Sequence, residues 1–286
     1  MLELLVNPKK AERKPWHMFL IGFIYASLSV FIASFVFSGD SVLSNYMGIF
    51  IIMFCVIFSL PFVYYTIKLE ERKDHEYNQE RTLLKEHSKA ILMFLWLFIG
   101  FVVAFSIWYM VLPNGENFFR AQIETFCQIN RPDNFQECVS NYGLKVSDKI
   151  TGAFSSGEKL LSIFSNNISV LIFTLIFSLI FGAGAIFILA WNASVIAAAI
   201  GIFTKSDISQ LFLGLGRYLI HGIPEIAAYF VAALAGGILS IAIIRKEYER
   251  SNFWAIVEDS LTLVIIAIVI LFISALIEVF ITPKLF

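Results

Sequence analysis

The stretch RYLIHGIPEIAAYFVAALAGGILS, from Arg217 to Ser240, sets three ionisable side chains inside a run that is otherwise apolar enough to lie in a bilayer. These side chains belong to Arg217, His221 and Glu225. An ionisable residue at membrane depth costs roughly 2.5 to 3.5 kcal/mol on insertion scales, and such residues usually pair or line a water-filled site. The stretch therefore predicts a membrane helix and makes these three residues the first candidates for a functional site.

The composition of the whole chain agrees with a membrane protein. Its 286 residues are 58% hydrophobic and 15% charged, and the mean hydropathy is +0.79. Soluble domains are about 45 to 50% apolar and about 25% charged. A formal net charge of −1 provides no field that would attract nucleic acid. We therefore expect an all-α, multi-pass helical protein of the plasma membrane, with the lipid bilayer as its first partner and no nucleic acid.

Six apolar runs are each long enough to cross a hydrocarbon core of about 30 Å. They lie at about 16–37, 46–67, 90–112, 167–190, 223–244 and 260–281. Lys and Arg gather before the first run and within 68–89, whereas 38–45 contains neither. The positive-inside rule then places the N-terminus and 68–89 in the cytoplasm. We expect a transmembrane hairpin with a basic linker over 1–89, and a membrane domain over 90–286 whose loop 113–165 is extracytoplasmic.

Residues 168–203 are too long for one crossing. A helix of these 36 nearly uninterrupted apolar residues would extend about 54 Å at 1.5 Å per residue. We expect an interruption near Asn192, which makes 192–203 either a re-entrant half-helix or a second, compressed crossing. The choice decides the side of the C-terminus and stays open. Asn166 and Asn167, at the start of the fourth run, are most simply N-caps.

Pro224 predicts a second interruption, at 221–224. Proline lacks an N–H, clashes with the carbonyl four residues earlier, and suits the first turn of a new helix. With Gly222 beside it, Glu225 would fall at the positive end of a new helix and His221 at the negative end of the preceding one, with Arg217 one turn earlier. Half-helix ends of this kind form the ion and substrate sites of transporters. A closed network that satisfies the freed backbone groups is the alternative reading.

Two further residues are expected near this polar group. Glu278 stands in the last turn before Pro283, where the helix dipole disfavours a carboxylate, so a cation such as Arg217 or Lys284 should be close, or the side chain should reach the headgroups. Asn192 is expected to stabilise the interruption in its own segment. The candidate site, a polar network or ligand site, therefore comprises Arg217, His221, Gly222, Pro224, Glu225, Glu278 and Asn192.

Small residues at every fourth position predict close helix packing, because they let helix backbones approach in lipid. One stripe comprises Ala193, Ala197 and Gly201, and the other Ala228, Ala232, Gly236 and Ser240. Either stripe can pack within the chain or across a dimer, so a homo-oligomer is among the expected partners.

The cysteines favour an extracytoplasmic loop and argue against a metal. Cys127 and Cys138 share the loop 113–165, where a disulfide is the expected state and two separate thiols the alternative. No cysteine–histidine spacing typical of zinc occurs. The P-loop-like GAFSSGEK at 152–159 has Glu158 where the lysine belongs, and no nucleophile elbow or HExxH is present. We expect no metal, no cofactor and no enzymatic activity.

Three segments resemble the stage II sporulation protein M family of membrane proteins. They are NNISVLIFTLIFSLIFGAGAIFILAWNASVIAAAIG (166–201), HGIPEIAAYFVAALAGG (221–237) and SALIEVFITP (274–283), in the family's order. The resemblance covers roughly 90–286 and leaves 16–67 as two additional spans. Ala193 stands where a glycine often follows the asparagine.

The resemblance implies an integral membrane protein whose sporulation members help to recruit and localise cell-wall hydrolases during engulfment. We therefore expect a non-catalytic scaffold or anchoring protein that engages partner proteins, as a dimer or with other membrane or extracytoplasmic proteins. The alternative is a transporter or channel subunit with its ion or substrate site at His221–Glu225.

Overall fold

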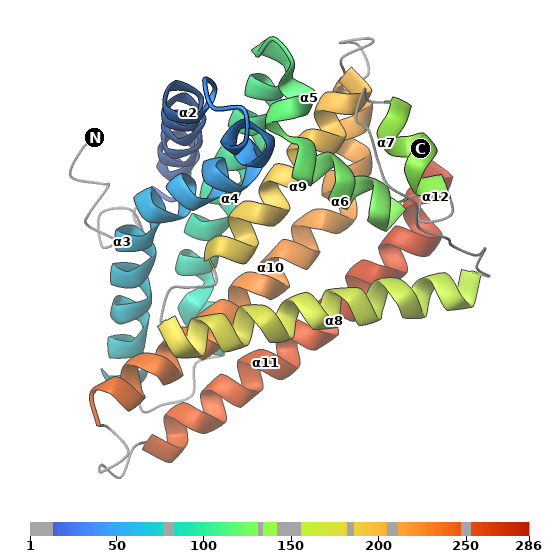
Figure 1. The fold of residues 1–286 in the computed structure, drawn as a ribbon. Helices are drawn as coiled ribbons and strands as arrows, with labels where there is room; N and C mark the ends of the chain where they lie inside the picture. Colours follow the sequence, from blue (N-terminus) through green and yellow to red (C-terminus); the bar gives the residue numbers. More distant parts are fainter. Residues whose placement is uncertain are drawn as a thin grey trace.

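The computed structural model describes residues 14–76, 83–130, 134–141, 156–181, 186–204, 211–246 and 253–285. The described residues form helices and no strand, which confirms the predicted all-α class (Figure 1). The helices are α2 (His17–Phe37), η2 (Leu43–Tyr46), α3 (Met47–Glu76), α4 (Leu83–Val111), α5 (Gly115–Phe118), α6 (Arg120–Asn130), α7 (Phe135–Asn141), α8 (Ser156–Phe181), α9 (Ile186–Thr204), α10 (Leu211–Ile244), α11 (Phe253–Leu276), η6 (Ile277–Ile281) and α12 (Thr282–Leu285).

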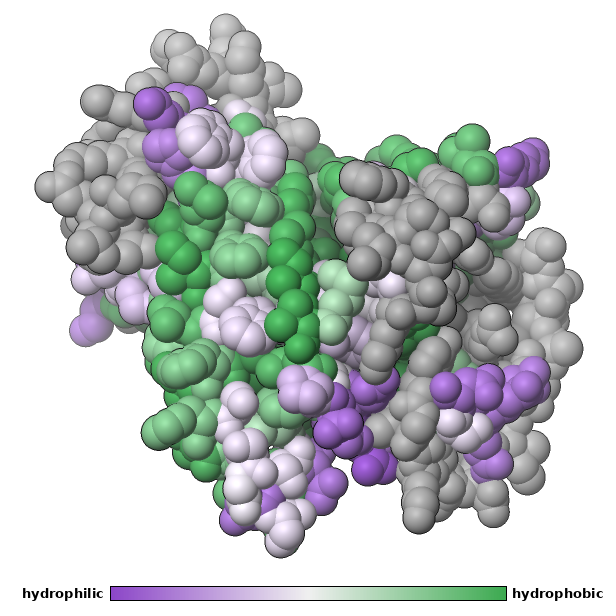
Figure 2. Space-filling model, turned by 90° about the horizontal axis from the view of Figure 1, so that it is seen from above, coloured by the Kyte–Doolittle hydropathy of each residue, from purple (hydrophilic) through white to green (hydrophobic). Residues whose placement is uncertain are grey.

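Within the described part of the chain, six helices are long and apolar enough to cross a membrane, so the multi-pass prediction is confirmed. They are α2, α3, α4, α8, α10 and the continuous α11–α12 segment. The apolar part of α9, Ile186–Ile202, is shorter. Seen from above (Figure 2), apolar side chains form a broad continuous surface, and hydrophilic side chains gather in separate clusters toward its borders. Such a surface suits contact with lipid.

Helix α4 is the centre of the bundle. Its phenylalanines Phe94, Phe98, Phe101 and Phe105 are all at most 2% exposed. The ring of Phe94 stacks on that of Phe230 in α10, with centroids 5.2 Å apart. Helix α4 therefore also packs against the second half of the chain. Aromatic pairs of this kind contribute about 0.5 to 1.5 kcal/mol beyond the area they bury.

Two glycines let α2 and α4 cross in backbone contact. A Cβ atom added at Gly22 would overlap the carbonyl oxygen of Leu97, and one at Gly100 would overlap that of Phe19. Small residues permit this approach in lipid, where helix association depends on van der Waals packing rather than on the hydrophobic effect. The turn that follows α2 is closed by Asp40, whose Oδ1 accepts hydrogen bonds of 2.8 Å from the backbone N–H groups of Val42 and Leu43. These two bonds hold the pKa of Asp40 below its ordinary value.

The interruption predicted near Asn192 does not occur at this residue. Helix α8 ends at Phe181 and α9 begins at Ile186. Asn192 is inside α9, where its Nδ2 donates to the carbonyl oxygen of Ile188 at 2.8 Å. The asparagine amide thus bonds its own helix instead of opening it. With 19 residues, α9 is about 28 Å long, close to the thickness of a hydrocarbon core.

The break predicted at 221–224 is wrong, because α10 continues through Pro224 as one helix of 34 residues. Pro224 cannot donate the bond to the carbonyl four residues earlier, and its ring disturbs the turn before it. A neighbouring helix supports that turn, since the Oγ of Ser274 in α11 donates to the carbonyl oxygen of His221 at 2.6 Å. Membrane helices tolerate proline where a Ser or Thr of a neighbour satisfies the backbone in this way.

Both small-residue stripes are buried inside the chain. A Cβ at Gly201 would overlap the Tyr109 ring of α4, and a Cβ at Gly236 would lie 2.8 Å from the carbonyl oxygen of Leu175 in α8. Ser178 of α8 also donates to the carbonyl oxygen of Ala233 at 2.6 Å. The stripes therefore pack α9 on α4 and α10 on α8. In Figure 1, α8 runs across the lower part of the view at a large angle to α2 and α3.

The basic linker expected over 68–89 contains an unforeseen buried contact. Helix α3 continues to Glu76 and α4 already begins at Leu83. Between them, the Nδ1 of His87 lies 2.8 Å from the Oε2 of Glu70, and both side chains are 0% exposed. The division of the chain at residue 89 into a hairpin and a membrane domain stays a prediction.

Candidate functional site

A cavity of about 410 Å³ lies between α6, α8, α9, α10 and η6. It is lined by Phe126, Gln128, Ile163, Asn166, Asn167, Val170, Asn192, Val195, Ile196, Ala199, Tyr218, His221, Gly222, Glu225, Ile226 and Glu278. Ligand cavities measure about 300 to 1,000 Å³ and combine apolar walls with a few polar groups. This cavity has the size and the mixed lining of such a site.

Five of the seven candidate residues line this cavity. They are Asn192, His221, Gly222, Glu225 and Glu278, which come from three helices. Pro224 lies beside them in α10, without lining the cavity. Arg217 is in α10, but its side chain lies outside the described residues, so its predicted pairing with Glu278 stays a prediction. Their role as a functional site likewise stays a prediction.

The Glu225 side chain is held by its own helix. The hydroxyl of Tyr229, one turn later in α10, donates to Oε1 of Glu225 at 2.8 Å. Tyr229 is fully buried, whereas Glu225 is half-buried and faces the cavity. A carboxylate with one oxygen fixed in this way keeps a defined direction, which is a requirement for selective binding.

A π-helical turn brings Glu278 to the cavity. The turn η6, Ile277–Ile281, continues α11 with one extra residue in its hydrogen-bonded ring. Thr282, which follows the turn, donates to the carbonyl oxygen of Ile277 at 3.2 Å, and its Oγ1 lies 3.4 Å from the Nδ1 of His221. Because a π-turn rotates the residues after it relative to an α-helix, it changes which side chains of α12 face α10. Such turns are frequent at functional sites.

Two asparagines of α8 form one side of the cavity. They are not the expected N-caps, because α8 begins ten residues before Asn166, at Ser156. The Nδ2 of Asn166 lies 3.4 Å from the Oδ1 of Asn167. Asn167 is 4% exposed, and its Nδ2 has no hydrogen-bond partner among the described residues. A buried donor left without a partner costs about 1 to 3 kcal/mol.

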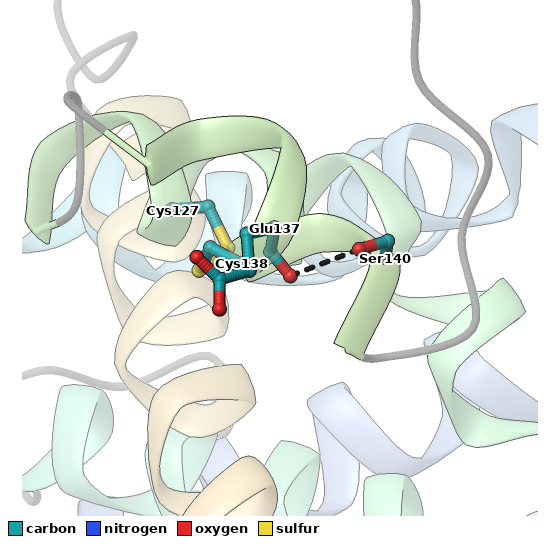
Figure 3. Close-up of a disulfide and its surroundings, with 4 residues drawn as sticks. All are labelled: Cys127, Glu137, Cys138 and Ser140. Carbon is teal, nitrogen blue, oxygen red and sulfur yellow. Dashed lines mark hydrogen bonds between the residues drawn. A yellow bond between two sulfur atoms is a disulfide. The ribbon is translucent and has the colours of Figure 1, made fainter.

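Helix α6 forms the remaining wall and is fixed by a disulfide to α7. The sulfur atoms of Cys127 and Cys138 are bonded, and their Cα atoms are 5.8 Å apart (Figure 3). Cys127 lies between the two cavity-lining residues Phe126 and Gln128. The Phe126 ring meets that of Tyr218 in α10 edge to face, with centroids 6.2 Å apart. The disulfide thus restrains the helix that faces the candidate residues of α10.

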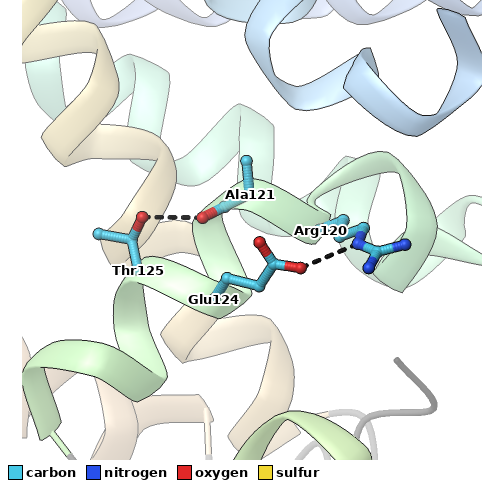
Figure 4. A network of polar contacts seen from close by, with 4 residues as sticks. All are labelled: Arg120, Ala121, Glu124 and Thr125. Carbon is cyan, nitrogen blue, oxygen red and sulfur yellow. Dashed lines mark hydrogen bonds and ion pairs between the residues drawn. The ribbon is translucent and has the colours of Figure 1, made fainter. Parts of the chain in front are cut away.

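Further contacts attach α6 to the membrane helices and order its outer side. The buried Gln122 donates from Nε2 to the carbonyl oxygen of Gly48 in α3 at 3.1 Å. On the more exposed side, Arg120 donates from Nε to Glu124 at 2.9 Å, and Thr125 donates to the carbonyl oxygen of Ala121 at 2.8 Å (Figure 4). We call the unit made by α5, α6 and α7 the cap. It is a folded unit seated on the bundle.

The lining of the cavity combines polar and apolar side chains. Its polar groups are two carboxylates, one imidazole, one phenol and four amides, set in an apolar wall. Among the residues that the structure describes, no three His, Cys, Asp or Glu side chains are grouped as a metal site requires.

The sequence reasoning missed Asn167, Tyr218, Tyr229 and the contribution of α6. Tyr229 stands one turn after Glu225, and this spacing alone could have suggested the hydrogen bond. No local signal joins α6 or Asn167 to the site, because these contacts arise from helices brought together by the fold.

The fold and the cavity define a polytopic α-helical membrane protein with a polar cavity among its helices. The chain belongs to the stage II sporulation protein M family, whose sequence profile matches residues 11–283. The match begins before α2, so the first two helices, which the resemblance left outside, lie within the matched region. A stretch of 127 residues is 32% identical to the uncharacterized protein MJ0793 of Methanocaldococcus jannaschii and covers 43% of this chain and 71% of that protein. No solved structure matches the chain.

Proposed function

We propose that this protein is a non-catalytic membrane scaffold that positions partner proteins through its cap. The observation that carries the proposal is the construction of the cap: a disulfide joins α6 to α7, and Gln122 attaches α6 to α3. A rigid unit restrained against transmembrane helices holds a partner in a defined place, and it loses little conformational entropy on binding. The role of the family's sporulation members in recruiting proteins agrees with this proposal.

The proposal requires the cap to be extracytoplasmic. The positive-inside rule favours that side for 113–165, and a disulfide persists in an oxidising compartment. The length of α9 supports a seventh crossing by this helix. Arg245 and Lys246, which follow α10, would then be cytoplasmic and the C-terminus extracytoplasmic.

Photo-crosslinking in the native cell tests the scaffold function. A photoreactive residue at the exposed cap positions Asn117 or Glu137 is expected to yield discrete adducts with other proteins, whereas one at exposed Ile265 of α11 should not. Changing both cysteines to alanine should reduce the yield of adducts at least about fivefold. The reason is that the disulfide contributes about 3 kcal/mol by restraining the unfolded cap.

Two results would contradict the scaffold function. One is the absence of adducts at both cap positions in a chain expressed and inserted at the normal level. The other is the same adducts, in the same yield, from Ile265 as from the cap.

The cavity favours a second candidate function, a transporter or channel subunit with its site at His221 and Glu225. Cavities that hold ionisable residues among membrane helices often mark substrate or ion pathways. In this case, vesicles containing the purified protein should show a flux of an ion or small solute, which His221→Ala should abolish and the surface change Glu258→Gln should leave intact. Absence of flux over a broad panel of ions and solutes would exclude this candidate and leave the scaffold function untouched.

A further inference from the structure

We propose that the cavity binds a molecule that carries several hydroxyl groups on a carbon frame, a sugar or polyol, either free or as the headgroup of a glycolipid. Binding of this kind shares with the second candidate function only the premise that the cavity holds a ligand. It does not require transport, and it is independent of the scaffold function of the cap.

Two hydrogen-bond acceptors in the lining are held in place and left accessible. The hydroxyl of Tyr229 bonds Oε1 of Glu225, and the Nδ2 of Asn192 bonds the carbonyl oxygen of Ile188 in its own helix. The other carboxylate oxygen of Glu225 and the amide oxygen of Asn192 bond no other described residue, and neither is enclosed by protein. The enclosed Nδ2 of Asn167 is not one of these accessible groups.

These two oxygens select a ligand that donates hydrogen bonds. Because the amide nitrogen of Asn192 faces a carbonyl, its oxygen is fixed as the accessible atom. A fully ionised oxyanion only accepts hydrogen bonds, so it has no donor for either oxygen. The requirement for donors involves neither Glu278 nor the side chain of Arg217, and it does not depend on the net charge of the lining.

The edge of the cavity provides donors as well as acceptors. Gln128 and Asn166 lie at this edge, and both side chains are exposed amides. A hydroxyl both donates and accepts, so a molecule with several hydroxyls can donate to the two half-buried oxygens and accept from the amides. An ammonium has three donors and no acceptor, and therefore satisfies only the first group.

The apolar part of the lining suits the carbon frame of such a molecule. The rings of Phe126 and Tyr218 meet edge to face with centroids 6.2 Å apart, and Val195, Ile196 and Ile226 line the same cavity. Sugars and polyols have C–H groups between their hydroxyls, which aromatic and aliphatic side chains can cover. The volume of about 410 Å³ is in the range of sites for small molecules.

Thermal unfolding of the purified full chain tests the proposal, in a polyoxyethylene detergent because its headgroup carries no sugar. The probes are myo-inositol, glucose and glycerol, each paired with a similar frame that has a single hydroxyl: cyclohexanol, tetrahydropyran-2-methanol and 1-propanol. At least one polyol should raise the Tm by about 5 °C or more, with no comparable shift from its paired alcohol. All probes stay at millimolar concentration, because concentrated sugars stabilise any folded protein by exclusion from its surface.

Two variants remove the accessible acceptors. Asn192→Leu removes no contact to another helix, and leucine favours a helix more than asparagine does, so the protein should keep its monodisperse elution profile. Binding of the active polyol should weaken about tenfold or more. Glu225→Gln should weaken it similarly, because an amide nitrogen that only donates replaces the accessible oxygen. Glu258→Gln, exposed on α11, is the matched control.

A third variant reduces the space for the ligand without changing a polar group. Gly222 is buried and lines the cavity, and a Cβ atom there would approach only the Cδ1 of Ile196, at an ordinary contact distance of 3.8 Å. Gly222→Ala should therefore fold normally, and the added methyl group should weaken binding about tenfold. If either acceptor variant fails to fold, this variant decides whether the polyol occupies the cavity.

The lipid source is tested in nanodiscs. Monoglucosyldiacylglycerol should raise the Tm relative to phosphatidylcholine, whose headgroup has no hydroxyl. Native mass spectrometry should find the glycolipid retained by the wild-type protein and lost from Asn192→Leu.

Hydroxyl-specific binding that Asn192→Leu or Gly222→Ala weakens supports the proposal, and the arm in which it occurs identifies the source. Absence of a hydroxyl-specific shift in both arms overturns it, and so does a shift that both variants leave unchanged. Stabilisation by putrescine or inorganic phosphate in place of the polyols overturns it as well. Binding without flux in vesicles would exclude transport and keep the hydroxyl site, and the cap adducts test the scaffold function separately.

Discussion

Replacing Gly100 by alanine is expected to destabilise the protein by about 3 kcal/mol or more, because the helix crossing between α2 and α4 has no room for a Cβ atom. The added carbon would overlap the carbonyl oxygen of Phe19 and lie 3.1 Å from the Cα of Gly22. Backbone atoms cannot rotate away as a side chain can, so the two helices must separate. Overpacking usually costs about 1 to 3 kcal/mol where side chains can adjust, and here none can. The measurements are the Tm in detergent and the fraction of monodisperse protein in size-exclusion chromatography.

The chain offers a control in which the same substitution should act in the opposite direction. Nothing lies within 4 Å of a Cβ at Gly39, in the exposed turn after α2. Gly39→Ala should leave the stability unchanged or raise it by about 0.4 to 1 kcal/mol, because it reduces the freedom of the unfolded chain. Gly22→Ala should behave like Gly100→Ala. Because both glycines lie at one crossing, the double variant should cost less than the sum of the two. Equal stability of the Gly39 and Gly100 variants would refute the close crossing.

The membrane helices were predictable from the sequence because insertion into a bilayer depends directly on the hydrophobicity of a segment. A run of about 20 apolar residues must form a helix in lipid, since every backbone polar group has to be satisfied within the segment. The lengths of the helices were harder to predict. Helix α8 begins before the predicted fourth run and α3 ends after the second, because turns outside the hydrocarbon core follow helix propensity and packing rather than hydropathy.

The two expected interruptions show where local reasoning fails. Asn192 and Pro224 are both poor residues for a helix interior, and the sequence alone favours a break at each. The structure keeps both helices intact through particular contacts: the Asn192 side chain bonds its own helix, and Ser274 supports the turn at His221. The second contact joins residues 53 positions apart. No window of sequence around Pro224 contains that information.

The candidate site was predicted in part for a general reason. Ionisable residues in an apolar run are costly, so they indicate where polar groups must meet, and the structure brings five of the seven candidates to one cavity. The cost does not indicate which other helices contribute. Asn167 and Tyr218 carry no charge, and α6 lies outside the predicted spans. Hydropathy therefore does not indicate that they contribute to the cavity.

Exchanging His87 for leucine is expected to destabilise the protein by about 3 to 5 kcal/mol, although the sequence places this residue in a basic linker. His87 and Glu70 are hydrogen-bonded at 2.8 Å, and both side chains are 0% exposed. Removing one partner of a buried ionisable pair takes stabilisation from the other, which still bears the cost of desolvation. The free energy of unfolding by denaturant, or the Tm in detergent, measures the loss.

A double-mutant cycle and an exposed pair distinguish this contact from a general effect of the substitution. If the pair itself is responsible, Glu70→Leu combined with His87→Leu should recover most of the stability, because two apolar side chains of similar size remove the desolvation cost altogether. The pair of Arg120 and Glu124 has nearly the same separation, 2.9 Å, but its side chains are 35% and 38% exposed. Arg120→Leu should therefore cost less than about 0.5 kcal/mol, since solvent screens an exposed i,i+4 pair. A His87→Leu cost as small as that of Arg120→Leu would mean that α3 and α4 are held together by apolar packing alone. A large cost with a coupling free energy above about 2 kcal/mol would instead mean that the buried pair contributes substantially to holding α3 against α4.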